Sequence, residues 1–214
     1  FISDNPHDIK NEGGSVHLQQ SGGGIHAGKS DSIVVSATQF TMEGWFYFDG
    51  VKENQSPFFI NDGGLNKRSI KIHFENDGSA YNNFKVNIRT QSGGQSLDFP
   101  YNFKKYAWYH VALTKQGRNY ELFVNGFSQG TQAIGDAPLD GSPSNNFVGS
   151  SADAGHPGYI SDFRVVHFIA YTGDFILPRS PLAAVPNTAL LLNFQDAGIY
   201  DRTGRNNLAA VGNA

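Results

Sequence analysis

The chain has 214 residues and a net charge of −3, and only 16% of its residues are Asp, Glu, Lys or Arg. This share is below the usual value of about a quarter, and without a basic excess we expect no nucleic-acid partner. Because the sequence contains no Cys, it excludes disulfide bonds, thiolate metal sites and a cysteine nucleophile. It also lacks an apolar run of about 18 residues, so no membrane insertion is expected.

Short runs of β-branched and aromatic residues, bounded by Gly, Asn, Asp and Ser, follow one another along the chain. Each run is predicted to be a β-strand: Ser15–Gln20, Ser32–Val35, Phe40–Phe48, Pro57–Asn61, Arg68–Asn76, Phe84–Thr90, Ser96–Pro100, Ala107–Thr114, Tyr120–Asn125, Asn146–Val148, Gly158–Val166, Ala189–Phe194 and Leu208–Val211. Only Tyr171–Phe175 resembles a helical turn. Such frequent turns are typical of a sandwich or jelly roll, so the sequence predicts an all-β fold with two antiparallel sheets.

Local patterns add detail to this prediction. Ile70–Phe74 and Phe84–Arg89 alternate between apolar and polar residues, which predicts strands with one wet face. Asn125-Gly126 predicts a type I′ turn in a hairpin. Trp45 and Trp108 lie inside strand patterns and are expected to fill the core.

The glycine-rich stretches are short turns and give no long linker. We therefore expect one domain over residues 1–214. Because the sequence starts with Phe1, we expect this domain to be a fragment of a longer polypeptide.

Three motifs span most of the chain in a recognisable order. They are Phe40–Phe46 (FTMEGWF), residues 108–126 (WYHVALT followed by LFVNG) and Gly158–Val165 (GYISDFRV). With them the chain resembles the laminin-G-like, concanavalin-A-like jelly-roll superfamily. The resemblance implies a sandwich that displays recognition loops.

The tail of the chain carries a more particular pattern. Its elements are Tyr171–Phe175, Pro178, Pro181-Leu182, Thr188–Leu192 and Asp201–Gly204. The pattern is similar to a subgroup of these domains in structural and tail-fibre proteins of bacteriophages, which also occurs in large secreted bacterial proteins. The resemblance implies surface display and names no ligand.

Candidate catalytic groups are sparse. Glycoside hydrolysis needs two carboxylates beside the scissile bond, and jelly-roll hydrolases place them as Glu-x-Asp-x-x-Glu, which this chain lacks. Its five Glu residues are scattered: Glu12, Glu43, Glu53, Glu75 and Glu121. Neither His-x-x-x-His nor Gly-x-Ser-x-Gly occurs. We expect a protein that is not an enzyme, with a glycan-cleaving enzyme as the weakest alternative.

Calcium is the one cofactor that the resemblance implies, because laminin-G-like domains often bind a single Ca²⁺ at the sandwich rim. The loops with hard oxygen ligands suited to this ion contain Asp62, Asp77 and Asp136. Asp-Gly pairs are equally ordinary in turns, and Gly22–Gly24 lacks the Asp that family members often have there.

Ligand contacts are expected on loops at one rim, where binding residues collect on a rigid scaffold. The candidates combine aromatic and neutral polar side chains suited to sugars, although such loops can be simple solvated turns. They are Asp77, Tyr81, Asn82, Asn83, Asp153 and His156.

Together these features favour a non-enzymatic virion module, such as a phage fibre, knob or decoration, that recognises host-surface carbohydrate. Its partners would be a host glycan, neighbouring virion proteins and further copies of itself. The alternative is an extracellular binding module of a secreted bacterial adhesin or carbohydrate-active enzyme.

Overall fold

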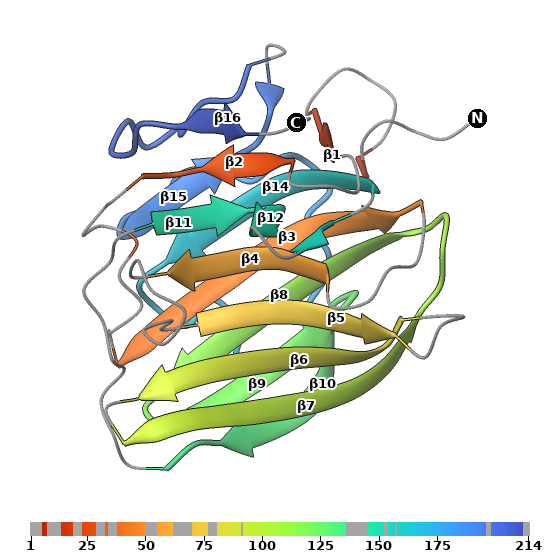
Figure 1. Ribbon diagram of the computed structural model, residues 1–214, viewed down its shortest axis with the longest axis vertical. Helices are drawn as coiled ribbons and strands as arrows, with labels where there is room; N and C mark the ends of the chain where they lie inside the picture. Colours follow the sequence, from red (N-terminus) through yellow and green to blue (C-terminus); the bar gives the residue numbers. More distant parts are fainter. Residues whose placement is uncertain are drawn as a thin grey trace.

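The computed structural model (Figure 1) describes most of the chain. The described residues are 6–7, 14–18, 23–28, 33, 38–49, 55–61, 70–76, 81–90, 92–135, 145–151, 154–156, 158–195 and 198–211. Within them, no helix has the length and apolar character that crossing a membrane requires.

The first of two seven-stranded antiparallel sheets is called sheet A. Its strands run in the order β1 (Val16–Leu18), β14 (Gly158–Val166), β3 (Gln39–Phe48), β8 (Trp108–Gln116), β9 (Asn119–Val124) and β10 (Phe127–Ala133). The seventh strand, β15 (Thr188–Leu192), pairs with the C-terminal half of β14, whereas β1 pairs with the N-terminal end of β14. Sheet A therefore joins strands from both ends of the sequence.

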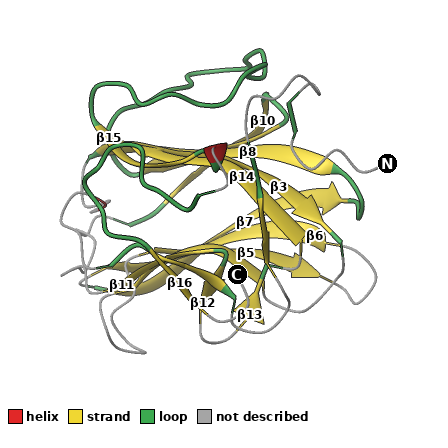
Figure 2. Ribbon diagram, turned by 90° about the horizontal axis from the view of Figure 1, so that it is seen from above, coloured by secondary structure: helices red, strands yellow, loops and turns green. Residues whose placement is uncertain are grey.

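The second sheet is called sheet B. Its order is β16 (Ala209–Val211), β2 (Gly24–His26), β11 (Asn145–Val148), β4 (Gln55–Asn61), β5 (Ile70–Asn76), β6 (Tyr81–Thr90) and β7 (Gly93–Phe103). A short ribbon of β12 (Ser150–Ser151) and β13 (Ala154–Gly155) follows β11. Seen from above, the two sheets lie as two layers (Figure 2), which confirms the predicted antiparallel sandwich.

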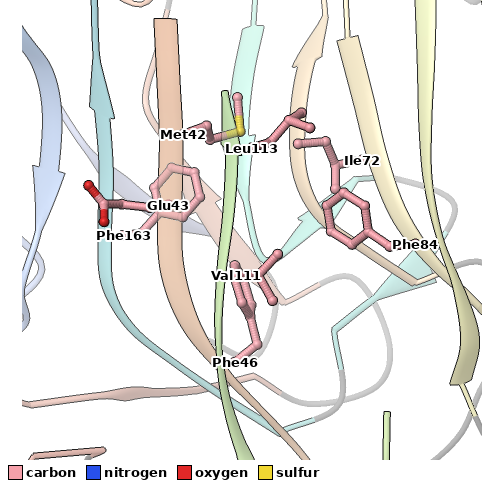
Figure 3. Close-up of a pocket in the computed structure, with 8 residues that line it drawn as sticks. All are labelled: Met42, Glu43, Phe46, Ile72, Phe84, Val111, Leu113 and Phe163. Atoms are coloured by element: carbon pink, nitrogen blue, oxygen red, sulfur yellow. The ribbon is translucent and has the colours of Figure 1, made fainter. Parts of the chain in front are cut away.

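The core lies between the layers and is rich in Phe. Alternate residues of β3, among them Met42, Phe46 and Phe48, point inward and join the core cluster. Figure 3 shows such side chains around a cavity of about 10 Å³, which is close to the lower limit for holding one water. The neighbouring Glu43 carboxylate points away from this cluster. Among the described residues, the space between the sheets is therefore filled by side chains and leaves no room for a ligand.

Most predicted strands are present, and the Asn125-Gly126 turn is confirmed by positive φ angles of 51° and 82°. The predicted strand Ser32–Val35 falls mostly outside the described residues, and Ile33 within it is in a 3₁₀ conformation. The predicted helical turn at Tyr171–Phe175 is wrong, because these residues form bends and irregular structure. Strand β10 was not predicted, since most of its side chains are exposed and give no apolar signal.

Candidate functional site

The outer face of sheet A is partly covered by the connection between β14 and β15. We call residues 167–187 the strap; in Figure 2 a long loop lies on this side of the sheet. Thr41 anchors the start of the strap, since its hydroxyl donates to the Phe168 carbonyl and accepts from the Ala170 amide, both at 2.8 Å. The strap thus turns the middle of this sheet face into buried surface.

Beneath the strap lies a buried ion pair. Arg164 of β14 donates to Oε1 of Glu43 through Nε at 2.9 Å and Nη2 at 2.6 Å. The Tyr171 hydroxyl of the strap donates to Oε2 of Glu43 at 2.6 Å, and Nε2 of His110 lies 3.3 Å from the same oxygen. Arg164 also donates to the Ala183 carbonyl at 3.0 Å. This network ties β14, β3 and β8 to the strap.

The network keeps Glu43 ionised. Burial alone raises the pKa of this carboxyl, but the contacts with His110, Arg164 and Tyr171 outweigh burial and hold the pKa below its usual value. The side chain of Glu43 is fully buried. Glu43 is therefore a structural anion, and its occupied oxygens do not face solvent as a general acid would have to.

An aromatic stack fixes the centre of the strap. The rings of Tyr171 and Phe175 are stacked with centroids 3.6 Å apart, and both pack on Phe123 of β9. The Phe175 amide donates to the Gly126 carbonyl at 2.9 Å. A Cβ atom on Gly126 would lie 2.3 Å from the Phe175 carbonyl oxygen, so this close approach requires glycine.

One edge of the strap forms a polar pocket with strands β8, β9 and β10. We call it the strap pocket; its volume is about 180 Å³. Its lining combines hydroxyl, amide and carboxylate groups with one aromatic ring: Thr114, Gln116, Asn119, Glu121, Thr131, Ile169, Tyr171 and Thr172. A concave site with convergent polar groups is the default candidate for binding a small molecule.

The register of the strands explains why these side chains converge. Thr114 lies opposite Glu121, which lies opposite Thr131, so all three share the outer face in one row. Gln116 and Asn119 are paired one step further along the strands. The Ser128 hydroxyl donates to Glu121 at 2.6 Å and orients its carboxylate. The strap then supplies the wall with Tyr171.

The outer face of sheet B is built differently. Lys85 of β6 lies 2.9 Å from Glu75 of β5 and 3.3 Å from Asp98 of β7. Nδ2 of Asn83 donates to the same two carboxylates at 3.1 and 3.0 Å. These groups satisfy one another across three strands and form a polar ladder on this face.

The structure scatters the predicted ligand residues. Asn83 belongs to this ladder and Asn82 beside it is exposed. The backbone of Tyr81 lies in β6, whereas Asp77 and Asp153 lie outside the described residues. No described contact brings this set together.

His156 departs from the expectation of a rim residue. Its side chain is fully buried, and its ring packs against Phe46 and Phe48 of the core. Nε2 of His156 lies 3.0 Å from the Tyr47 carbonyl. The position of His156 next to loops suggested exposure, but its ring completes the core between the sheets.

Calcium stays a prediction. Asp62, Asp77 and Asp136, the predicted ligands, all lie outside the described residues. In the part of the chain that the structure describes, no group of three or more His, Cys, Asp or Glu residues is placed to hold a metal ion.

The tail motif has a structural basis of its own. Asp201 accepts hydrogen bonds from the Leu191 amide at 3.1 Å, the Thr203 hydroxyl at 2.5 Å and the Asn206 side chain at 2.7 Å. Burial raises the pKa of Asp201, but these hydrogen bonds outweigh it and lower the pKa below the usual value. The motif thus fixes the last part of the chain to β15.

Comparisons with known proteins agree with this architecture. The family model described as "Concanavalin A-like lectin/glucanases superfamily" matches residues 21–170. No curated protein matches the chain significantly.

Similar solved structures share the fold at low sequence identity. A Bacteroides ovatus protein, provisionally named a carbohydrate binding protein, has a TM-score of 0.63 and 20% identity, over 92% of this chain and 60% of its own length. The CBM40 domain of the Ruminococcus gnavus IT-sialidase, bound to α2,3-sialyllactose, has a TM-score of 0.57 and 16% identity, over 74% and 91%. A pentraxin from Limulus polyphemus has a TM-score of 0.54 and 13% identity, over 77% and 80%.

Proposed function

The chain belongs to the concanavalin A-like lectin/glucanases superfamily, and from that premise we propose that it is a non-catalytic carbohydrate-binding module. The observation that carries the proposal is the strap pocket, where neutral amides and hydroxyls surround the Tyr171 ring. Such groups match the hydroxyls of a sugar in both donors and acceptors. Two of the structural neighbours are named for carbohydrate binding, which supports this class of ligand.

The pocket favours binding over cleavage. Among its lining residues Glu121 is the one carboxylate, whereas glycoside hydrolysis uses two. The other candidate, Glu43, is buried and paired with Arg164. We therefore propose that the module holds a glycan without cutting it.

The best-supported ligand is a neutral sugar. Glu121 would repel an acidic sugar, and the other lining groups carry no charge. Affinity for a single small polar site is expected to be weak, so tight attachment would need many copies of the module. Binding should change little with salt because no strong ion pair is formed.

The experiment is a glycan array probed with the domain on a multivalent carrier. The double variant Gln116→Ala/Asn119→Ala should reduce binding about tenfold or more, since both side chains line the pocket. The matched control Asn82→Ala/Asn102→Ala removes two exposed amides elsewhere. If binding falls only in the control variant, the binding site lies at the rim of sheet B and not in the strap pocket. Cleavage of an arrayed glycan would overturn the non-catalytic assignment.

For biological placement we propose a virion surface module. The support is the tail pattern around Tyr171 and Asp201, which resembles phage fibre proteins and here secures the strap and β15. Antibodies against the domain should label purified phage particles in electron micrographs. Labelling of uninfected bacterial cells or their secretions instead would favour the alternative, a secreted bacterial binding module; the bacterial origin of two structural neighbours favours that reading.

A further inference from the structure

A row of aromatic side chains crosses the end of sheet A that is opposite to the strap pocket. The pairing register aligns His17 with Tyr159, Tyr159 with Tyr47, and Tyr47 with Trp108, on the outer face of four neighbouring strands. His17 and Tyr159 are stacked at 4.5 Å, and the Tyr47 ring lies 5.5 Å from Trp108 and 5.8 Å from Tyr159. We call these four residues the aromatic row.

The row is accessible to solvent at several points. The His17 side chain is 44% exposed, Tyr159 and Trp108 are half-buried, and the adjacent Tyr106 is 68% exposed. Cross-strand aromatic pairs often serve only to stabilise a sheet. Here, however, the row lies at the end of the sheet away from the strap pocket, and a contiguous cluster of partly exposed aromatic rings is typical of a binding site.

Polar groups accompany the rings. The Asp49 carboxylate lies 3.1 Å from Nε2 of His17 and is 36% exposed. In the middle of the row, the Tyr47 hydroxyl is buried with no hydrogen-bond partner among the described residues. Burial raises the pKa of Tyr47, and Asp49, Tyr106 and Tyr159 add to the effect, so these groups lie around one hydroxyl. The Tyr47 side chain is only 2% exposed, so it supports the neighbouring rings and does not itself reach a ligand.

We propose that the aromatic row is a second carbohydrate site, which takes the apolar face of a neutral pyranose. A pyranose with equatorial hydroxyls presents C–H bonds on its ring face, which suit Trp108 and Tyr159, and hydroxyls at its edge, which suit the exposed Asp49 carboxylate. The Asp49 carboxylate disfavours sialic and uronic acids. Three strand spacings make the row roughly 14 Å long, so it accommodates an oligosaccharide better than a single sugar.

This site is independent of the strap pocket. Trp108 and Thr114 stand at opposite ends of the same face of β8, six residues or roughly 20 Å apart. Between them Phe175 of the strap packs on His110. One sugar ring therefore cannot touch both sites, and each can be tested by itself.

The chain contains two Trp residues, which makes fluorescence a specific reporter. In a Trp45→Phe background, Trp108 is the sole indole. Titration with cellotetraose or chitotetraose should shift or quench its emission, and tri-galacturonic acid should have no effect. Emission unchanged by both neutral oligosaccharides would overturn the proposal.

Variants then separate the two sites. Calorimetry measures the variants, because Trp108→Ala removes the fluorescent reporter. Trp108→Ala and, separately, Asp49→Ala should each weaken binding of the neutral oligosaccharide about tenfold. Asp49→Ala keeps all four aromatic side chains and removes only the carboxylate, including its contact with His17. Gln116→Ala/Asn119→Ala should leave the Trp108 signal unchanged. If that variant abolishes all binding and the Asp49 variant has no effect, the aromatic row is not a site and the pocket alone remains.

Discussion

The outer faces of the two sheets differ in what covers them. On sheet A the strap seals the Glu43–Arg164 pair, and β3 is buried on both of its faces. On sheet B the Lys85–Glu75 pair stays partly exposed, and the described part of β6 alternates between buried and half-buried side chains. The same kind of ion pair is therefore a structural anchor on one face and a solvated contact on the other.

This difference shows that the cost of breaking an ion pair depends on whether the pair is shielded from water. Under the strap, Glu43 and Arg164 have lost water and depend on each other, on Tyr171 and on the Ala183 carbonyl. On sheet B, water can replace a lost partner of Lys85. Four predictions break or sharpen this contrast, from the largest expected effect to the smallest.

Replacing the cation of each pair should separate the faces most strongly. Arg164→Met leaves the Glu43 carboxylate buried without its main partner, and should lower the free energy of unfolding by about 3–5 kcal/mol. Lys85→Met should lower it by less than about 1 kcal/mol. Chemical denaturation of the two variants measures both values, and equal losses would show that the strap does not isolate its pair.

The core beneath both faces should give a pH dependence. Burial lowers the pKa of His156 to about 4, below the ordinary 6.5. Between these two pKa values the unfolded chain binds a proton at His156 and the folded chain does not. The contribution of neutral His156 to the free energy of unfolding is therefore fully present above pH 6.5 and is lost as the pH falls towards 4. The loss should approach about 3 kcal/mol.

The matched variant for this effect is His156→Gln, which keeps a donor for the Tyr47 carbonyl but does not titrate. Its unfolding free energy should vary less between pH 7 and pH 4 than that of the parent. His73, whose pKa burial also lowers to about 4, remains in both proteins and contributes the same background. An identical pH profile for parent and variant would contradict the burial of His156.

Adding one methyl group beneath the strap tests the close contact there. Gly126→Ala would place Cβ 2.3 Å from the Phe175 carbonyl oxygen at a positive φ, and should cost about 2 kcal/mol. Gly117→Ala, also at positive φ but with nothing within 4 Å, should cost about 1 kcal/mol. Thermal unfolding compares the two variants. Equal losses of stability would show that the strap does not pack closely against Gly126.

Calcium should have the smallest effect. We expect at most one weak site on the loops of Asp62, Asp77 and Asp136, with oxygen ligands at about 2.3–2.6 Å. Isothermal calorimetry should give a weak, single-site isotherm, and Ca²⁺ should raise the melting temperature only slightly. Tight binding at several sites would refute this prediction.

Sequence reasoning succeeded where a strand has one wet face. The alternation of Ile70–Phe74 and Phe84–Arg89 predicted β5 and β6 correctly. In such strands the residues that face water are polar and the residues between them, which face the core, are apolar. Sequence reasoning was right about Trp45 only in part: this side chain is buried as expected, but it packs beside His110 on the covered outer face of sheet A and not between the sheets. Trp108 was also expected in the core, but it lies half-buried on the same outer face.

The candidate sites were harder to predict because they depend on register and on the strap. Thr114, Glu121 and Thr131 are unremarkable in sequence and converge only when β8, β9 and β10 pair. Tyr171 was visible as part of the tail pattern, but its bond to Glu43 across 128 positions carries no local signal. The sequence gives one hint of this contact: Tyr171 follows soon after β14, the strand that contains Arg164.

The pairing of β2 with β16 also bears on how the chain folds. Ile25 is aligned with Ala210, and Asp201 secures the segment just before β16. Contacts between residues so far apart in sequence slow folding, because a long loop must close before they form. During synthesis from the N-terminus, β2 cannot pair with β16 until almost the whole described chain has been made. Until then the edge of β2 that pairs with β16 is exposed and can take part in aggregation.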